Sequence, residues 1–247
     1  MMKRFHDIAA AVFAILSFVA LADPISAARA APAERFEITS LKAVRPTLVN
    51  TLDAAQKRDA ARARESFEAY DSAWNGIEFY VNTRSRQMYE LLEHQYQARI
   101  TKALEAASPD FAAIAPDVQG MLAKFDELVA MVEKATPLNA LYDDVARLRI
   151  VRAHLREVPP ALKVSNFAKA RKSFKNFDEN WDSIEDLIKA RSADAYVAIE
   201  KGMIEIEDAL MPEKPDVTKA TALVNDVMTR YNAVLGEIAK DARAANR

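Results

Sequence analysis

Residues 177–200 read FDENWDSIEDLIKARSADAYVAIE, and residues 70–93 read YDSAWNGIEFYVNTRSRQMYELLE. Both stretches contain an aromatic residue followed by Asp, then Trp, Ile-Glu, Arg-Ser, Tyr and Glu at the same spacing. They hold the only two tryptophans of the chain, Trp74 and Trp181, in register. Because chance similarity between helical segments seldom aligns the rarest residues, the pattern predicts an internal duplication.

The similarity extends beyond these two stretches. Residues 59–78 align without a gap to residues 166–185, and one residue is lost after the last shared Glu before KAL…SPDF matches DAL…KPDV. The chain therefore divides into a predicted unit 1, residues 31–136, and a predicted unit 2, residues 137–247. The identical pairs are Arg64/Arg171, Ser66/Ser173, Phe67/Phe174, Asp71/Asp178, Trp74/Trp181, Ile77/Ile184, Glu78/Glu185, Arg84/Arg191, Ser85/Ser192, Tyr89/Tyr196 and Glu93/Glu200.

Composition and periodicity predict an all-α protein. Only four glycines occur in 247 residues, which favours helices and leaves few residues for hairpin turns. Apolar residues recur at steps of three and four, as on one face of an amphipathic helix. Unit 1 is predicted to have helices at 38–57, 60–83, 86–106 and 109–134, and unit 2 at 138–157, 167–190, 193–210 and 215–244. Short connections between them predict two tandem four-helix bundles.

The prolines refine these boundaries. Ser108 before Pro109 is typical of an N-cap followed by proline at the first helical position. Pro159 and Pro160 are expected to end a helix, because the residue before a proline avoids the helical conformation. Pro46 and Pro116 lie inside predicted helices, where we expect a kink or a later start.

The N-terminus has the features of a secretory signal peptide. The basic segment MMKRFHD precedes the apolar run IAAAVFAILSFVALA and the small residues of DPISAARA, and this order is typical of signal peptides. Cleavage after Ala22 or after Ala30 fits; a retained signal anchor is the alternative. The chain has no cysteine, which excludes disulfides, thiolate metal sites and lipoprotein anchoring. We expect export to a bacterial periplasm, without stable membrane insertion after cleavage of residues 1–30.

The charge balance excludes a polyanion-binding protein. The chain has 34 basic and 36 acidic residues, and the predicted signal peptide contains only three of the former and two of the latter. A nucleic-acid-binding protein would show a clustered basic excess. We therefore expect no nucleic-acid partner.

The shared Arg-Ser step is either a turn or the middle of one long helix. Serine is a good N-cap and Asp194 suits a helix N-terminus, so we predict a turn at Ser85 and at Ser192. A helix rises ~1.5 Å per residue, and a turn would bring the carboxylates before and after each serine to similar levels. Asp, Trp and Glu at i, i+3 and i+7 would lie on one face of the first helix of each pair.

The polar side chains that such a turn would gather between its two helices are called the seam below. Two interpretations of the seam compete, and a groove for a peptide or small molecule is a third. In the first, the acids are structural and are satisfied by arginines, tyrosine hydroxyls and the indole N–H groups, which would fix the helix register. In the second, oxygen ligands on facing helices bind iron or another divalent metal. The predicted metal ligands are Glu78, Glu93, Glu185, Glu200, Asp71 and Asp178, supported by Arg84, Arg191, Tyr89, Tyr196, Trp74 and Trp181.

Catalytic motifs are absent from the sequence. There is no Gly-rich phosphate loop, no G-x-S-x-G and no HExxH. The Glu-x-x-His pair of di-iron bundles is also missing. We therefore predict no catalytic residues, no cofactor other than a metal ion, and no enzymatic activity.

The pattern aromatic-x-x-x-W-x-x-I-E, then R-S, then Tyr with Glu four residues on, resembles the periplasmic helical region of bacterial high-affinity iron permeases. The likeness covers about fifty residues of each unit, in YDSAWNGIE…RSRQMYELLE and FDENWDSIEDLIKARSADAYVAIE. It implies a free-standing periplasmic accessory or metal-handling component of iron uptake, with an inner-membrane iron permease as partner. The membrane permease segments that carry Arg-Glu-x-x-Glu motifs in that family are missing, so transport itself is not implied. A second, weaker likeness is to imelysin-type periplasmic iron-uptake proteins, whose Gly-x-His-x-x-Glu motif is also missing.

The predicted function is thus that of an exported, non-enzymatic helical protein that assists iron or other divalent-metal uptake. The alternative is a periplasmic structural or chaperone-like helical scaffold without a metal site.

Overall fold

The structure is a computed structural model that describes residues 34–245. These residues form an all-α fold with no β-strand among them. The predicted signal peptide, residues 1–30, lies outside the described residues. Between residues 34 and 245, no helix combines the length and the apolar character needed to cross a membrane.

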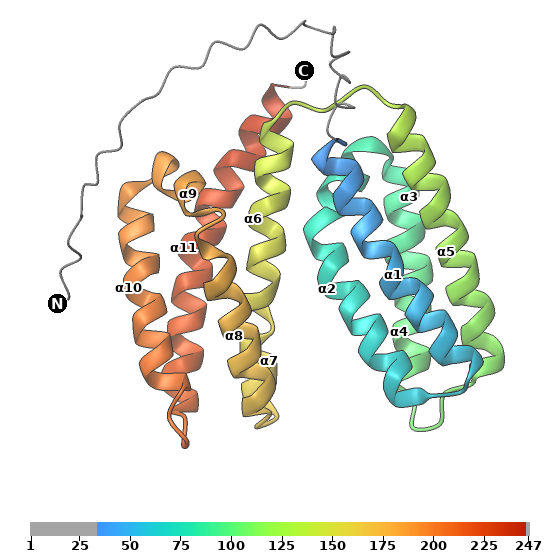
Figure 1. Cartoon of the computed structure of the whole chain (residues 1–247), viewed down its shortest axis with the longest axis horizontal. Coiled ribbons are helices and arrows are strands. Elements are labelled where there is room, and N and C mark those ends of the chain that lie inside the picture. The colour runs from blue at the N-terminus through green and yellow to red at the C-terminus, as the bar shows by residue number, and fades with distance from the viewer. Residues whose placement is uncertain (1–33, 246–247) are drawn as a thin grey trace, which may run out of the picture. The chain divides into compact units, whose positions relative to one another are not determined.

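The first four-helix bundle consists of α1 (Phe36–Gln56), α2 (Ala60–Arg84), a third helix in three segments, and α5 (Phe111–Lys134). The third helix runs through α3 (Arg86–Tyr89), the π-helical segment η1 (Glu90–Gln97) and α4 (Ala98–Glu105). Figure 1 shows these helices side by side, from blue to green. The predicted boundaries agree with them to within two residues.

The second bundle consists of α6 (Leu141–Arg156) with the short α7 (Val158–Lys163), α8 (Phe167–Trp181) with α9 (Glu185–Arg191), α10 (Ala193–Leu210) and α11 (Val217–Ala244). The predicted continuous helix 167–190 is wrong, because residues 182–184 form a turn between α8 and α9. Ser183 explains the break: its hydroxyl and its backbone N–H both donate to the carbonyl of Asn180. Such local bonds compete with the helical i→i−4 pattern.

The structure also corrects the predictions about proline. Asp110, not Ser108, caps α5: its carboxylate accepts the backbone N–H of Ala112, and Pro109 lies before the helix. Helices α1 and α5 begin well before Pro46 and Pro116 and continue through them. Packing of the apolar faces on both sides therefore outweighs the local cost of about 3 kcal/mol for an interior proline.

Local structure repeats at matched positions of the two units. Arg58 and Ser165 have left-handed backbones with φ of 56° each. Arg58 and Ser165 each donate their backbone N–H to the carbonyl oxygen three residues earlier. The residues that follow them donate to the carbonyl oxygens of Ala54 and Ala161, five residues earlier. This is the Schellman motif that ends a helix. The origin of the two units by duplication stays an inference from the sequence.

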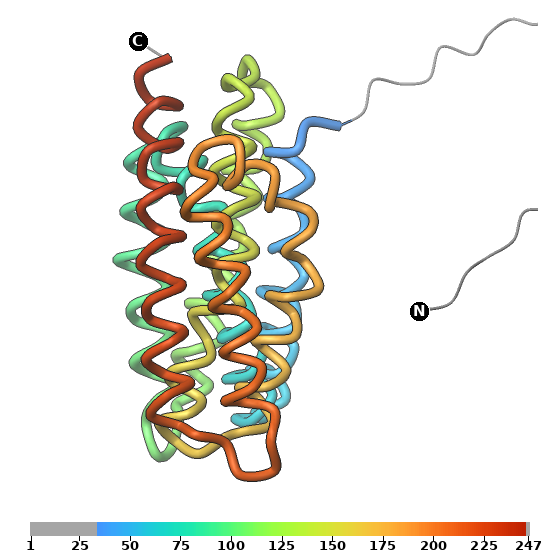
Figure 2. Tube along the Cα trace, turned by 90° about the vertical axis from the view of Figure 1, so that its left-hand side faces the viewer, coloured from blue at the N-terminus to red at the C-terminus, as the bar shows by residue number. Residues whose placement is uncertain are grey.

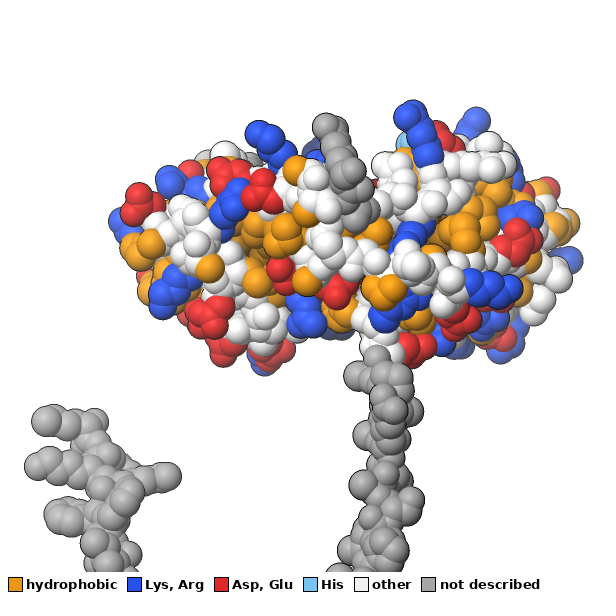
Figure 3. Space-filling view, turned by 90° about the horizontal axis from the view of Figure 1, so that it is seen from above, with side chains coloured by type: hydrophobic (Ala, Val, Ile, Leu, Met, Phe, Trp, Pro, Cys, Tyr) orange, Lys and Arg blue, Asp and Glu red, His pale blue; other side chains and the backbone are white. Residues whose placement is uncertain are grey.

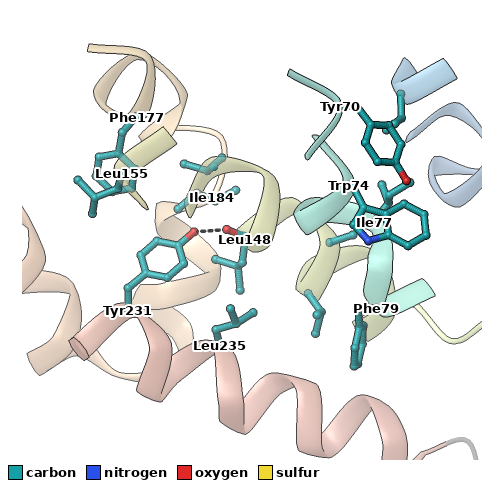
Figure 4. Packing of buried hydrophobic residues seen from close by; sticks show 14 of the residues in the cluster. Tyr70, Trp74, Ile77, Phe79, Leu148, Leu155, Phe177, Ile184, Tyr231 and Leu235 are labelled. Atoms are coloured by element: carbon teal, nitrogen blue, oxygen red, sulfur yellow. Dashed lines mark hydrogen bonds between the residues drawn. The ribbon is translucent and has the colours of Figure 1, made fainter. Parts of the chain in front are cut away.

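The buried apolar side chains of both bundles form one connected core. Figure 4 shows Tyr70, Trp74 and Ile77 of bundle one and Phe177, Ile184 and Tyr231 of bundle two within it. The buried Tyr231 hydroxyl donates to the carbonyl oxygen of Leu148 at 2.7 Å. The bundles meet where α2 packs against α6.

Helix α2 packs closely against α6 at Gly76. A Cβ added there would lie 2.5 Å from Cγ1 of Ile150, whereas a Cβ at Gly236 would meet no atom within 4 Å. A methylene-sized overlap in a packed interior costs typically ~1–3 kcal/mol. Gly76 therefore leaves room for Ile150 of α6.

We predict that Gly236→Ala stabilises the protein by ~0.5–1 kcal/mol, because alanine is the better helix former. Gly76→Ala gains the same propensity but must displace Ile150, so it should be less stable than Gly236→Ala by about 1–3 kcal/mol. Urea denaturation measures both. Equal stability of the two variants would contradict the close packing of α2 on α6.

Candidate functional site

The predicted turns at the Arg-Ser steps are confirmed. Ser85 and Ser192 have extended backbones, with φ/ψ of −156°/103° and −154°/102°. Each hydroxyl oxygen accepts a backbone N–H three residues on, from Met88 or Ala195, at 3.1 Å. The capped turns bring α4 back against α2, and α10 back against α8 and α9.

The tryptophan of each unit donates a hydrogen bond across this hairpin. Nε1 of Trp74 donates to Glu93, and Nε1 of Trp181 donates to Glu200. Both indoles are buried, with exposed fractions of 1% and 3%. A buried indole N–H needs an acceptor. The shared spacing places the Glu opposite the Trp when the two helices of the hairpin pack together.

The other predicted carboxylates have different surroundings. Glu78 accepts from Nη1 of Arg149 in α6 at 2.6 Å, and Asp71 accepts from Nε2 of Gln97 at 2.6 Å. Glu185 lies near Tyr196: burial raises the pKa of the Tyr196 hydroxyl first, and the charges of Glu200 and Glu185 raise it further. Asp178 is exposed on α8.

Arg84 and Arg191, predicted to support the carboxylates of the hairpins, make ion pairs with acids of other helices. Arg84 makes a two-pronged ion pair with Glu37 in α1, at 2.6 Å for each contact. Arg191 binds Glu237 and Asp241 in α11, each at 2.8 Å. Both guanidinium groups extend away from the seam because they lie in the last turn before the capped serine, where they face the neighbouring helix.

Arg64 and Arg171, another matched pair, also bind groups outside the seam. Nε of Arg64 donates to the carbonyl oxygen of Leu104, and Nε of Arg171 donates to that of Leu210. These carbonyls lie at the C-terminal ends of α4 and α10, where intrahelical partners are missing. The two arginines therefore cap the second helix of each hairpin.

The π-helical segment accounts for the one-residue difference between the units. Nineteen steps separate Ser85 from Leu104, and eighteen separate Ser192 from Leu210. One extra residue in a helix is accommodated by a π-turn, and η1 lies in this interval. Counted back from the matched leucines, Gln97 takes the place of Met203. The extra residue thus delivers an amide to Asp71 in bundle one only.

Bundle one retains two buried polar atoms without a partner in this region. They are the hydroxyl of Tyr70 and Oε1 of Gln97. Tyr70 has no exposed surface, and Gln97 is 8% exposed. Burial raises the pKa of Tyr70, and the negative charges of Glu93 and Asp71 raise it further. The tyrosine hydroxyl therefore stays neutral.

Burial also raises the pKa of the two bundle-one carboxyl groups. For Glu93 the loss of solvation is the largest cause, opposed by the Trp74 hydrogen bond. For Asp71 the loss of solvation is opposed first by the charge of Arg156 and then by the Gln97 amide. Glu78 raises the pKa of both through its negative charge. The acids thus interact, but each has its own donor.

The described residues contain no group of three or more His, Cys, Asp or Glu side chains placed to hold a metal ion. The predicted ligands of bundle one point to different partners, on α2, α6 and η1. In bundle two, Asp178, Trp181 and Glu200 do line one groove of about 350 Å³ between α8 and α10. Metal binding by these residues stays a prediction.

A larger groove, which the sequence did not predict, lies where α2, α6 and α8 meet. It measures about 670 Å³. Among its lining residues, Glu157 accepts hydrogen bonds from Ser72 at 2.7 Å and Ser173 at 2.9 Å. Burial lowers the pKa of the adjacent His154, while the charge of Glu157 acts in the opposite direction. Glu157 lies outside the matched segments, so the repeat gave no signal for it.

Comparison of the chain with family models, with characterised proteins and with solved structures found no match.

We predict that Trp181→Phe and Glu200→Ala are not additive. Each removes one partner of the same buried hydrogen bond, so their coupling energy should be about 0.5–3 kcal/mol. A denaturant double-mutant cycle measures it. Trp181→Phe with Glu205→Ala is the control, because Glu205 pairs with Lys201 instead; equal coupling in both cycles would contradict a specific indole–carboxylate bond.

We also predict a pH-dependent effect of Glu93→Gln. The folded pKa of Glu93 lies above the ordinary value of 4.5, so the folded protein holds a proton that the unfolded chain has lost, and stability falls as pH rises through this interval. Because glutamine does not titrate, the Glu93→Gln variant does not lose stability in this way. Its unfolding free energy relative to wild type should therefore increase from pH 4.5 to pH 7, by at most ~1.4 kcal/mol per pKa unit.

Urea denaturation at several pH values tests this prediction. Glu105→Gln makes the same charge change at an exposed position away from the seam. If the unfolding free energy of Glu93→Gln relative to wild type fell with rising pH, that result would contradict the raised pKa.

Proposed function

We propose that this protein is an exported, non-catalytic helical scaffold that binds a protein partner. The observation that supports this proposal is the repeated indole–carboxylate hydrogen bond. Glu93 and Glu200, two of the four glutamates with the pattern expected of metal ligands, are acceptors for buried tryptophans. The repeated residues therefore hold helices together.

Energetics favour this role over metal ligation. A carboxylate that turned to a metal ion would leave its indole N–H buried without an acceptor, which costs about 1–3 kcal/mol. Glu78 would also have to leave Arg149, whose guanidinium is itself largely buried with 20% of its side chain exposed. The free energy of metal coordination would have to exceed both of these unfavourable terms for a metal to bind.

The proposal places the protein outside the enzymes for a similar reason. The hydroxyls of Ser72 and Ser173 lie in the groove that contains His154, but both donate to the carboxylate of Glu157. A nucleophilic serine needs a base that takes its proton, which is most often histidine. These serines instead tie α2 and α8 to the end of α6.

Iron or other divalent-metal uptake is the second candidate function. One observation favours it: Asp178 and Glu200 share the α8–α10 groove with Glu179, Asp182 and Glu207, and hard cations prefer oxygen ligands. With the resemblance to the periplasmic region of iron permeases, this candidate would make the protein an accessory of such a permease. Periplasmic localisation, common to both candidates, is proposed from the pattern of residues 1–30.

A metal titration separates the two candidates. The scaffold proposal predicts no bound metal after dialysis and no melting shift beyond ~1 °C with Fe²⁺, Fe³⁺, Mn²⁺ or Zn²⁺. A ligand that binds only the folded protein stabilises it by RT ln(1 + [L]/Kd). Stoichiometric binding that is lost in Asp178→Asn with Asp182→Asn, but kept in Asp53→Asn on α1, would overturn the scaffold proposal in favour of metal handling.

A further inference from the structure

The outer face of α10 carries an exposed apolar stripe. Val197 and Ile204 are each 63% exposed, and Met211 at the end of the helix is 37% exposed. These residues are spaced seven apart, which places them within about 20° of one line along a helix of 3.6 residues per turn. Single exposed apolar residues are ordinary, whereas an aligned set indicates an interaction surface.

The first bundle supplies an internal comparison. By the alignment of the two units, Val197, Ile204 and Met211 correspond to Glu90, Ala98 and Glu105. Bundle one folds with these polar or small residues at the same helical positions, so packing of the bundle does not require the stripe. The apolar residues of α10 therefore have another cause.

Acidic side chains flank the stripe. Helix α10 contains five acidic residues and one basic residue, Lys201, which is itself within 3.7 Å of Glu205. On one side of the stripe, Ile204 borders the α8–α10 groove of about 350 Å³, which Asp178, Glu179, Asp182, Glu200 and Glu207 line without any basic residue. The surface thus combines exposed apolar residues with an excess of acids, and Lys201 lies between Val197 and Ile204 on the same face.

No described helix covers this face. Figure 2, turned so that α10 and α11 face the viewer, shows α10 on the near side of the fold. The inner side of α10 is occupied, because Ile199, Met203 and Ile206 are buried in the core. By contrast, the face seen from above in Figure 3 carries interspersed acids and bases.

We propose that the outer face of α10 and the α8–α10 groove, together the α10 face, dock an amphipathic helix of a partner protein. The partner helix would carry large apolar residues seven apart, opposite Val197, Ile204 and Met211, with lysines or arginines beside them. Helix-in-groove recognition uses such i, i+3, i+4 and i+7 anchors, and the charge complementarity sets the orientation and accelerates encounter. This inference rests on the proposed scaffold function and names the kind of partner.

Charge argues against the other occupants of such a surface. In a symmetric dimer the same patch would face itself, which would bring one acidic surface against another. An anionic lipid surface or a nucleic acid would meet the same repulsion. A basic helix alone gains from both the apolar stripe and its flanks.

A peptide of 18 residues provides the probe, with leucines at heptad a and d positions, lysines beside them and a fluorescein label. We expect saturable binding by anisotropy that weakens at least ~10-fold when salt rises from 50 to 300 mM, because exposed charges are screened. The matched control peptide has every lysine replaced by glutamate and should not bind. Ile204→Glu and the pair Asp182→Lys with Glu207→Lys should each weaken binding at least ~10-fold, a loss of 1.4 kcal/mol.

Ala98→Glu, at the matching exposed position of bundle one, controls for the substitution and should bind as wild type does. These positions are on the surface, and circular dichroism confirms that each variant is folded. Equal binding of the two peptides, or undiminished binding by Ile204→Glu, would overturn the inference. A dimer detected by sedimentation and abolished by Ile204→Glu would also overturn it.

Failure here differs from failure of the proposed function. If neither peptide binds and the metal titration is also negative, the α10 face is not a docking site, while the scaffold proposal stands. If a divalent metal binds in the α8–α10 groove, the scaffold proposal fails as well.

Discussion

The buried hydrogen bond from tryptophan to glutamate, made once in each bundle, is the constraint on which the hairpins depend. An indole can be buried only if its N–H finds an acceptor, and the acceptor lies nineteen residues later on the returning helix. That separation requires a turn between them, and the serine caps at Ser85 and Ser192 supply it. The rest of each bundle packs around this fixed pair.

Much of the fold follows from patterns within single helices. Apolar periodicity, scarce glycine and the serine caps were enough to predict an all-α fold and most helix ends, because these signals act between residues close in sequence. The break after Trp181 was missed because Asp-Ser in mid-helix is only a weak local competitor. Its effect depends on Ser183 reaching the carbonyl of Asn180.

The site was less predictable, because ion pairs form between helices that the sequence does not place. Arg84 could be assigned to the seam or to any neighbouring helix, and only the fold shows that Glu37 is its partner. Glu157 gave no signal, since its serine partners lie 85 and 16 residues away in sequence. The Trp–Glu pair, in contrast, could be found because both members repeat at one spacing.

The two bundles use the same frame differently. In bundle one, Gln97 occupies the position beside Asp71 and closes the seam with an amide. In bundle two the matching residue is Met203, and the groove beside Asp178 stays open. Arginine pairing follows the same division: Arg84 is buried against Glu37, whereas Arg191 is paired at the surface. The two bundles share their buried apolar positions, and these differences lie in the hairpin around each Arg-Ser step.

The π-helical segment η1 has a consequence for how such a fold can vary. An added residue would normally rotate everything that follows it by 100° about the helix axis, which would turn the apolar side of α4 towards water. Because the widened turn takes up that rotation locally, Ile100 and Leu104 remain buried and Arg64 still reaches the end of the helix. One residue can therefore be added to the hairpin at η1 without changing which side of the helix is buried before and after it.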